Sequence, residues 1–232
     1  PVPYVHVVTP TTHKTLRGPR GAMIMVTKKG LKKDPSMGEK INKAVFPGLQ
    51  GGPHNHQTAA IAVALKEAAA PEFKKYGWQI VKNAKALAKE LTKLGYNLMT
   101  GGTDTHVMVI DLRNLGILGN TAAEGLEAAN IVLNRNAIPF DPNPPFYPSG
   151  IRLGAPGLTS RGMKEKEMRL IAKFIDSVLK GLSETKKRMN LKMEDEKKKD
   201  IREKIINATP VIPRVKKQVL TLCRRFPIPK IS

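Results

Sequence analysis

Cysteine, aromatic residues and long apolar runs are all scarce in this 232-residue sequence. The only cysteine, Cys223, excludes a disulfide within the chain and indicates a reducing compartment, so we expect a cytoplasmic protein in which Cys223 packs in a core or an interface. Aromatic residues make up 5% and do not alternate with basic ones, which argues against a reader of stacked bases. No apolar run approaches the ~20 residues of a membrane helix, so no membrane partner is expected.

Acidic residues are also few, with 19 Asp and Glu against 40 Lys and Arg, for a net charge of +21. About half of the excess lies in residues 163–232. Such a balance favours anionic partners such as phosphates, carboxylates or nucleic acid, although solvated lysine-rich helix faces would produce it too. We do not expect nucleic acid as the main partner. The first residues, Pro1 to Tyr4, lack Met and the features of a secretory signal, so we expect the chain to begin in mid-protein.

One stretch, residues 11–21, combines hydroxyls, an imidazole, a lysine, arginines and glycines: Thr11-Thr12-His13-Lys14-Thr15-Leu16-Arg17-Gly18-Pro19-Arg20-Gly21. It follows the apolar run Val5–Val8 and precedes Ala22–Thr27, which both predict buried strands. A lysine held at a strand end among cations is suited to act as a Schiff-base nucleophile. The alternative is that Lys14 is an ordinary surface lysine.

A second stretch, Val45–His54, is rich in glycine and proline and contains Gly51-Gly52. Glycines let backbone amides approach an anion, and the helix predicted from about His56 would add its N-terminus to such a phosphate site. His54 and His56 have no nearby cysteine or carboxylate cluster, so we expect no metal site there. A third stretch, Ser149–Pro156, places Arg152 between glycine and apolar strand residues, where its planar fork can bind a carboxylate.

These three stretches, in this order, resemble the serine hydroxymethyltransferase family, and so does the ending Leu222–Pro229. The resemblance implies a pyridoxal 5′-phosphate enzyme of fold type I, similar to aspartate aminotransferase, which exchanges serine and tetrahydrofolate for glycine and 5,10-methylenetetrahydrofolate. It implies the α/β class, with residues 1–70 completing a cofactor-binding large domain with a mixed, mostly parallel sheet. Residues 71–232 would then form a smaller α+β C-terminal domain.

The resemblance also implies residue roles. Lys14 would bind the cofactor covalently, with Thr11, His13 and Arg20 as further catalytic residues, and Gly51 and Gly52 would contact cofactor phosphate across a homodimer or homotetramer interface. Arg152 would anchor the amino-acid carboxylate, while Asn136 and Phe146 would face folate. Pro144 and Pro148 stand where the family usually has Ser and Thr, and Pro10 and Leu49 are further departures from its pattern.

The resemblance covers only the C-terminal half of the family. The missing half supplies the residues that hold the cofactor ring, so we expect this chain to be a fragment, or one half of a split enzyme, with little or no turnover alone. Two alternatives stay open. Pro144 and Pro148 would fit a pyridoxal-phosphate aldolase acting on other β-hydroxy amino acids, and the basic charge would fit a non-catalytic RNA-binding module.

Periodicity and composition predict the remaining elements. We expect an exposed loop over residues 28–40, helices over 56–70 and 72–94 with Gly95 as C-cap, and two strands over 96–99 and 106–112. Thr121 is predicted to cap a short helix. Residues 134–146 should form an ordered loop, the chain should be mainly helical from Met163, and the charged residues 186–204 should be exposed.

Overall fold

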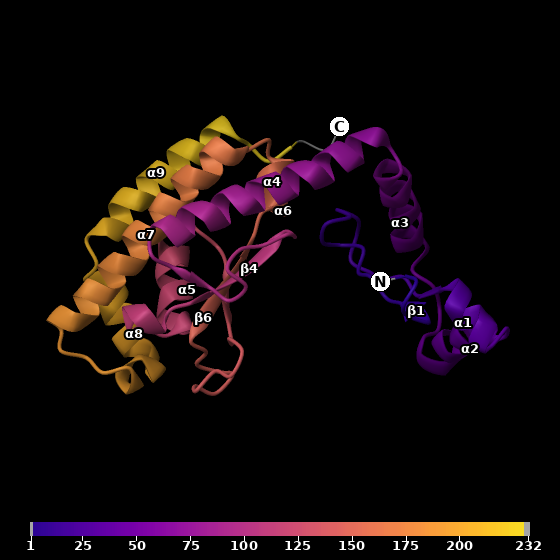
Figure 1. The fold of residues 1–232 in the computed structure, drawn as a ribbon, viewed down its shortest axis with the longest axis horizontal. Coiled ribbons are helices and arrows are strands. Elements are labelled where there is room, and N and C mark those ends of the chain that lie inside the picture. Colours follow the sequence, from indigo (N-terminus) through magenta and orange to yellow (C-terminus); the bar gives the residue numbers. More distant parts are fainter. Residues whose placement is uncertain (1, 230–232) are drawn as a thin grey trace. The chain divides into compact units, whose positions relative to one another are not determined.

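The computed structural model describes residues 2–229, which combine helices with two small sheets (Figure 1). The predicted α/β class is therefore confirmed. The chain divides into two compact units, Pro1–Lys75 and Tyr76–Ser232. The boundary lies within one long helix, α4 (Pro71–Lys93). The family-based domain boundary after residue 70 stays a prediction.

The first unit begins with a two-stranded antiparallel ribbon of β1 (Val7–Val8) and β2 (Met25–Val26), with the lysine loop between the strands. The strands are shorter than predicted and, instead of being buried, lie half exposed or exposed. The helical elements that follow are α1 (Lys28–Lys33), α2 (Met37–Lys43), the π-helical turn η1 (Ala44–Leu49) and α3 (Asn55–Ala68).

The predicted loop over residues 28–40 is wrong, because it contains α1 and most of α2. The reason is the cap at Thr27, whose side-chain oxygen accepts a hydrogen bond from the amide of Gly30 at 3.2 Å and also donates to the carbonyl of Val5 at 2.7 Å. This cap starts a helix that has too few apolar residues to show a period.

The first unit has almost no hydrophobic core of its own. Among its described residues the only buried apolar side chain is Ala64, which is 8% exposed. Large apolar side chains lie at its surface, namely Val2, Tyr4, Ile24, Met25, Leu31, Phe46, Leu49, Val63 and Leu65. Exposed apolar side chains in this number are typical of a surface that contacts other protein.

The second unit contains a four-stranded sheet in the order β3-β4-β6-β5. Its strands are β3 (Asn97–Leu98), β4 (Val107–Asp111), β5 (Asn134–Asn136) and β6 (Gly150–Gly154). Every strand pair in residues 2–229 is antiparallel, so this part of the chain contains none of the parallel pairing expected for the large domain. The predicted hairpin of β3 and β4 and the Gly95 turn, with φ of 92°, are confirmed.

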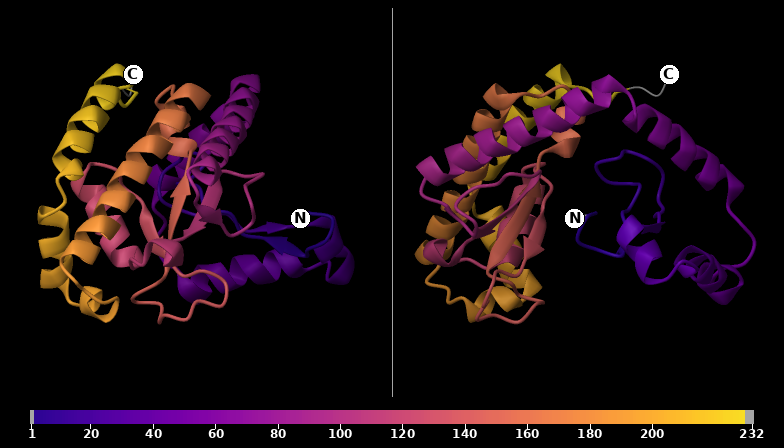
Figure 2. Two further views of the ribbon diagram at one scale, coloured as in Figure 1. Left: turned by 60° about the vertical axis from the view of Figure 1, so that its left-hand side comes forward. Right: turned by 45° about the vertical axis from the view of Figure 1, so that its right-hand side comes forward.

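Helices bury one face of this sheet (Figure 2). They are α4, α5 (Gly119–Ala128), the short α6 (Pro156–Ser160), α7 (Glu165–Arg188), α8 (Lys199–Asn207) and α9 (Val211–Arg225), with the 3₁₀ turns η2 (Arg113–Leu115) and η3 (Glu194–Lys197). Helix α7 packs against both α5 and α9. Ile110 and Ile151 of the sheet are fully buried together with Leu179 of α7. Across residues 2–229 no helix combines the length and apolar character of a membrane span.

The charged segment 186–204 is not exposed throughout, which corrects the prediction. Lys186 and Glu196 are buried and form an ion pair at 2.5 Å. Glu196 also accepts hydrogen bonds from the hydroxyl of Thr121 and the amide of Leu118. The prediction that Thr121 caps this helix is therefore wrong. Helix α5 begins two residues earlier, and the Thr121 hydroxyl bonds to the Glu196 carboxylate instead.

Candidate functional site

Thr12 organises the lysine loop. Its amide donates to the carbonyl of Gly21 at 3.0 Å, its hydroxyl donates to the carbonyl of Pro19 at 2.8 Å, and its own carbonyl accepts from the amide of Gly18 at 2.8 Å. The side chain is 1% exposed. Three bonds from one buried residue close the loop, and residues 13–17 therefore project from a fixed base.

Lys14 lies at the start of a tight turn within this loop. The amide of Arg17 donates to the carbonyl of Lys14 at 2.9 Å, and Arg17 has the left-handed φ of 59°. Lys14 is exposed, as are Thr11 and Arg20. Thr11 forms an isolated antiparallel bridge with Ala22, which extends the ribbon to the edge of the loop. An exposed amine on a closed loop is sterically free to react with an aldehyde.

His13 carries an unsatisfied atom next to Lys14. Its Nδ1 is buried and has no hydrogen-bond partner within residues 2–229. A buried polar atom of this kind costs free energy unless a ligand, water or further protein satisfies it. The unpartnered Nδ1 therefore fits a polar group bound beside Lys14.

Arg17, within this loop, makes a contact that the sequence did not predict. The guanidinium of Arg17 lies 5.8 Å from the centroid of the Phe73 ring, a distance typical of a cation–π contact. Arg20, the predicted arginine, is exposed and makes no salt bridge in the described part of the chain. Thr12 and Arg17 were both missed because neither has a distinctive spacing; only their place beside Lys14 could have indicated them.

Helix α3 links the lysine loop with the glycine stretch. A Cβ at Gly18 would lie 3.0 Å from the Cβ of Ala64, and one at Gly21 would lie 3.0 Å from the Ile61 side chain, so both glycines permit close packing on α3. The prediction that Gly51 and Gly52 precede a helix N-terminus is confirmed, because α3 begins at Asn55. Six residues of helix, about 9 Å, separate Asn55 from Ile61.

Gly51 and Gly52 are exposed, and a Cβ at either position would meet no atom within 4 Å. Packing within the described chain therefore does not require glycine at these positions. Their accessible amides are consistent with contact to something outside the chain, such as an anion near the helix N-terminus.

Arg152 and Asn136 lie on one face of the second unit's sheet. Arg152 of β6 pairs with Val109 on one side and Asn134 on the other, while Asn136 pairs with Gly150. Because residues two apart on a strand share a face, the side chains of Arg152 and Asn136 are diagonal neighbours on it. Arg152 is exposed and forms no salt bridge within residues 2–229.

The loop over residues 137–149 is held by Asp141. Its carboxylate accepts from the amides of Ile138, Asn143 and Ser149 at 3.2, 3.0 and 2.9 Å and from the Ser149 hydroxyl at 2.5 Å. Burial alone would raise the pKa of Asp141, but these hydrogen bonds outweigh burial and lower the pKa below its ordinary value. The ordered loop predicted over residues 134–146 is wrong for its first three residues, which form β5 by pairing with β6, and its organising carboxylate was not predicted.

The loop presents Phe146, which is 77% exposed. Its carbonyl accepts from the side-chain amide of Asn120 at 3.2 Å, so the backbone is fixed while the ring projects outward. Pro148 is buried, and its carbonyl accepts from the amide of Gly119 at 2.7 Å. That contact uses only the backbone, so Pro148 is accommodated without loss of this bond.

The predicted site residues fall into two sets. Thr11, His13, Lys14 and Arg20 share one loop of the first unit, to which α3 connects Gly51 and Gly52, whereas Asn136, Phe146 and Arg152 belong to the second unit. The first set offers an amine and an anion-binding backbone, and the second offers a carboxylate-binding cation, an amide and an aromatic ring. Residues 2–229 contain no group of three or more side chains suited to hold a metal ion.

Comparison with known proteins points to a single family. The family described as "Serine hydroxymethyltransferase" matches residues 1–175. A serine hydroxymethyltransferase of Rickettsia massiliae is 49% identical over 207 residues, which cover 89% of this chain and 46% of the relative. One of Acidothermus cellulolyticus is 56% identical over 178 residues, covering 77% of this chain and 40% of the relative. The chain thus spans less than half the length of these relatives.

Proposed function

Since this chain belongs to the serine hydroxymethyltransferase family, we propose that it forms the lysine-bearing part of a glycine hydroxymethyltransferase. This enzyme interconverts serine and tetrahydrofolate with glycine and 5,10-methylenetetrahydrofolate, using pyridoxal 5′-phosphate. The carrying observation is the exposed Lys14 next to the buried, unpartnered Nδ1 of His13 on a closed loop.

The described residues fit this cofactor at two points. The amine of Lys14 is accessible for covalent attachment of an aldehyde, and the amides of Gly51 and Gly52 are open near the N-terminus of α3. When bound, the cofactor ring supplies the electron sink for bond cleavage at the amino acid. In this proposal Gly51 and Gly52 contact the phosphate held by a neighbouring subunit of a homodimer or homotetramer.

The other residues bind and orient. Thr12 fixes the backbone of the loop from which Lys14 projects. Thr11 and His13 guide the substrate amine, and the unpartnered Nδ1 of His13 is available to it. In this proposal Arg20 supports the site from the turn that follows Lys14. Arg152 binds the substrate carboxylate with two parallel hydrogen bonds, since its fork is free of ion pairs in the described chain.

Folate binding is assigned to the same sheet face as Arg152. The Asn136 amide can pair with the edge of a pterin ring, and the exposed ring of Phe146 can lie against its face. The residues that hold the cofactor ring must come from elsewhere, so we propose that a separate N-terminal half completes the site. The exposed apolar side chains of the first unit are the surface that such a half would cover. We place the protein in the cytoplasm.

The test combines this 232-residue chain with the part of the Rickettsia massiliae relative that it does not match. With pyridoxal phosphate, serine and tetrahydrofolate, the mixture should form glycine, and each piece alone should show little or none. Lys14→Ala should abolish this activity, while Lys28→Ala, which removes an exposed lysine on α1, should leave it unchanged.

Three outcomes would contradict the proposal. Full turnover by the isolated chain would show that no further half is required. Undiminished activity of the mixture that contains Lys14→Ala would show that Lys14 is not the cofactor lysine. Cleavage of threonine without folate-dependent exchange would instead support the aldolase alternative.

A further inference from the structure

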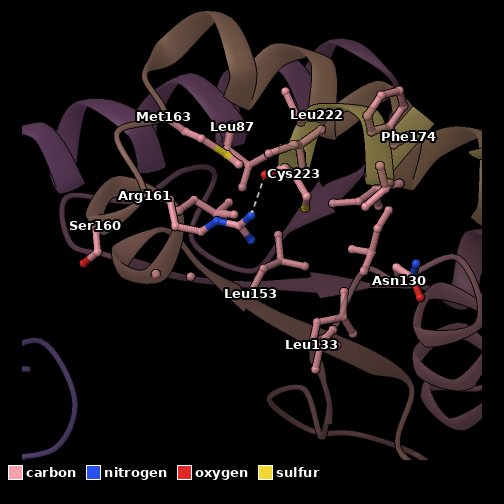
Figure 3. Close-up of a pocket in the computed structure, with 18 of the residues that line it drawn as sticks. Leu87, Asn130, Leu133, Leu153, Ser160, Arg161, Met163, Phe174, Leu222 and Cys223 are labelled. Atoms are coloured by element: carbon pink, nitrogen blue, oxygen red, sulfur yellow. Dashed lines mark hydrogen bonds between the residues drawn. The ribbon is translucent and has the colours of Figure 1, made fainter. Parts of the chain in front are cut away.

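The second unit contains a pocket of about 720 Å³ at the edge of the sheet (Figure 3). Residues 152–154 of β6 form one wall, and α6 with the turn after it forms another. Residues 130–134, the N-terminal half of α7 and the C-terminal end of α9 supply most of the rest. Leu87, Leu153, Met163, Phe174 and Leu222 are among its lining side chains. This volume and apolar character match pockets that hold small organic molecules.

Arg161 places a positive charge in this apolar surrounding. Its Nε donates to the carbonyl of Phe226 at 2.6 Å and one Nη donates to the carbonyl of Cys223 at 3.0 Å. These bonds fix the guanidinium, whose other terminal nitrogen points toward the side of Leu153 (Figure 3). That nitrogen makes no hydrogen bond or ion pair within residues 2–229.

The charges around the pocket have one sign. Its lining in the described chain includes Arg161 and Arg152 but no aspartate or glutamate. Side chains alternate across a strand, so Leu153 projects to the face opposite Arg152, and residues of both faces line the pocket. Arg161 is partly exposed and bonded to two backbone carbonyls, so its charge is tolerated in the free chain and its remaining N–H groups are open to an anion.

The entrance is also apolar. Val132 and Ile228, both lining residues, are 82% and 76% exposed. The single cysteine, Cys223, lines the same pocket and is partly exposed. An apolar rim beside a fixed cation suits a ligand that has an apolar body and one negative group.

We propose that this pocket binds a monocarboxylate with an apolar chain or ring, whose carboxylate pairs with Arg161 while its body lies against Leu153, Met163 and Phe174. The carboxylate is assigned to Arg161 and not to Arg152, which also lines the pocket and which the proposed function gives to the amino-acid carboxylate. The competing interpretation is that Arg161 only caps the C-terminus of α9, as its bonds to Cys223 and Phe226 do, and that the pocket binds apolar molecules without regard to charge.

Titration of the full chain with sodium decanoate by calorimetry tests the proposal. Saturable one-to-one binding is expected, with decanol, its neutral counterpart, bound about tenfold more weakly because it cannot form a charge-assisted bond. Bound decanoate should also slow the alkylation of Cys223, the only thiol in the chain. Equal affinity for decanol, or no protection of Cys223 at saturation, would overturn the proposal.

Variants distinguish binding in this pocket from attraction to the chain's overall positive charge. Arg161→Gln should weaken decanoate at least about tenfold, whereas Arg169→Gln, which removes an exposed cation of α7 outside the pocket, should not change it. Leu133→Trp should fill the pocket and abolish binding while Arg161 is retained. If Arg161→Gln fails to fold, Leu133→Trp and the protection of Cys223 decide the question. Equal losses in Arg161→Gln and Arg169→Gln, or undiminished binding by Leu133→Trp, would contradict the assignment.

Discussion

The hydroxyl of Thr12 donates to the carbonyl of Pro19 over 2.8 Å, across the base of the loop that carries Lys14. With its two backbone bonds, to Gly18 and Gly21, Thr12 makes the loop a closed structure although the unit around it has scarcely any apolar core. Polar contacts, rather than burial of apolar surface, hold the candidate cofactor lysine in place.

Removal of this hydroxyl should open the loop. Thr12→Val keeps the shape but leaves the Pro19 carbonyl without its donor, at a cost of about 1 kcal/mol. We expect the amide of Gly18, which bonds to the Thr12 carbonyl, to exchange its hydrogen about fivefold to tenfold faster by mass spectrometry or NMR. Thr12→Ser, which retains the donor, should exchange like the parent, and equal rates in all three proteins would contradict the role of Thr12.

The buried ion pair of Lys186 and Glu196 should control the stability of the second unit. Glu196→Gln leaves the Lys186 ammonium buried without its counter-charge, for which we expect a loss of about 3–5 kcal/mol in the free energy of unfolding, measured by urea titration. Glu194→Gln removes a neighbouring but exposed pair with Lys197 and should change it by less than about 0.5 kcal/mol. Similar losses in the two variants would show that the buried pair has no special weight.

Asp141 should make the loop over residues 137–149 sensitive to acid. Since hydrogen bonds lower the pKa of Asp141 in the folded chain, its contribution to stability is present above the ordinary aspartate pKa and is lost as the pH falls through the lowered value. The window from about pH 5 to about pH 3 extends roughly one unit to either side of the ordinary aspartate pKa. Across it, the urea midpoint should fall more in the parent than in Asp141→Asn.

A matched control is Asp200→Asn, at an exposed aspartate on α8. This variant should retain the acid-dependent fall of the parent. If Asp141→Asn loses stability with pH as steeply as the parent does, the carboxylate is not the group that organises the loop.

Arg152 should discriminate by geometry as well as by charge. In the combined enzyme, Arg152→Lys keeps the charge but loses the two-pronged contact, so the KM for serine should rise about tenfold. Arg135→Lys, on the adjacent strand β5 but paired with Ile151 rather than Arg152, should leave KM unchanged. An unchanged KM in Arg152→Lys would place the carboxylate elsewhere.

Elements with a clear period could be predicted from the sequence. Apolar spacing predicted α4 and the β3–β4 hairpin, because each buries a regular stripe or alternate side chains, and it predicted α3 although only Ala64 of that helix is buried. Helix α1 was missed because a cap at Thr27, rather than an apolar stripe, starts it. The burial of Lys186 and Glu196 was missed because a charged segment gives no sign of a partner ten residues away.

Some residues of the candidate site could likewise be predicted from the sequence, and others could not. Lys14, Gly51, Gly52 and Arg152 were indicated by residue types that only a few chemical roles require, and their roles stay predictions. Thr12 and Asp141 act through hydrogen bonds to backbone groups seven or eight residues away, which depend on how the loops close. The pocket around Arg161 joins segments that are far apart in sequence, so no local pattern could indicate it.

The position at which pyridoxal phosphate attaches shows whether Lys14 is the cofactor lysine. The full chain is mixed with equimolar pyridoxal phosphate and reduced with borohydride, and the modified peptides are located by mass spectrometry. Lys14 is expected to carry most of the label although the chain has many exposed lysines. Label spread evenly over the lysines, with Lys14 modified no more than Lys28, would contradict it.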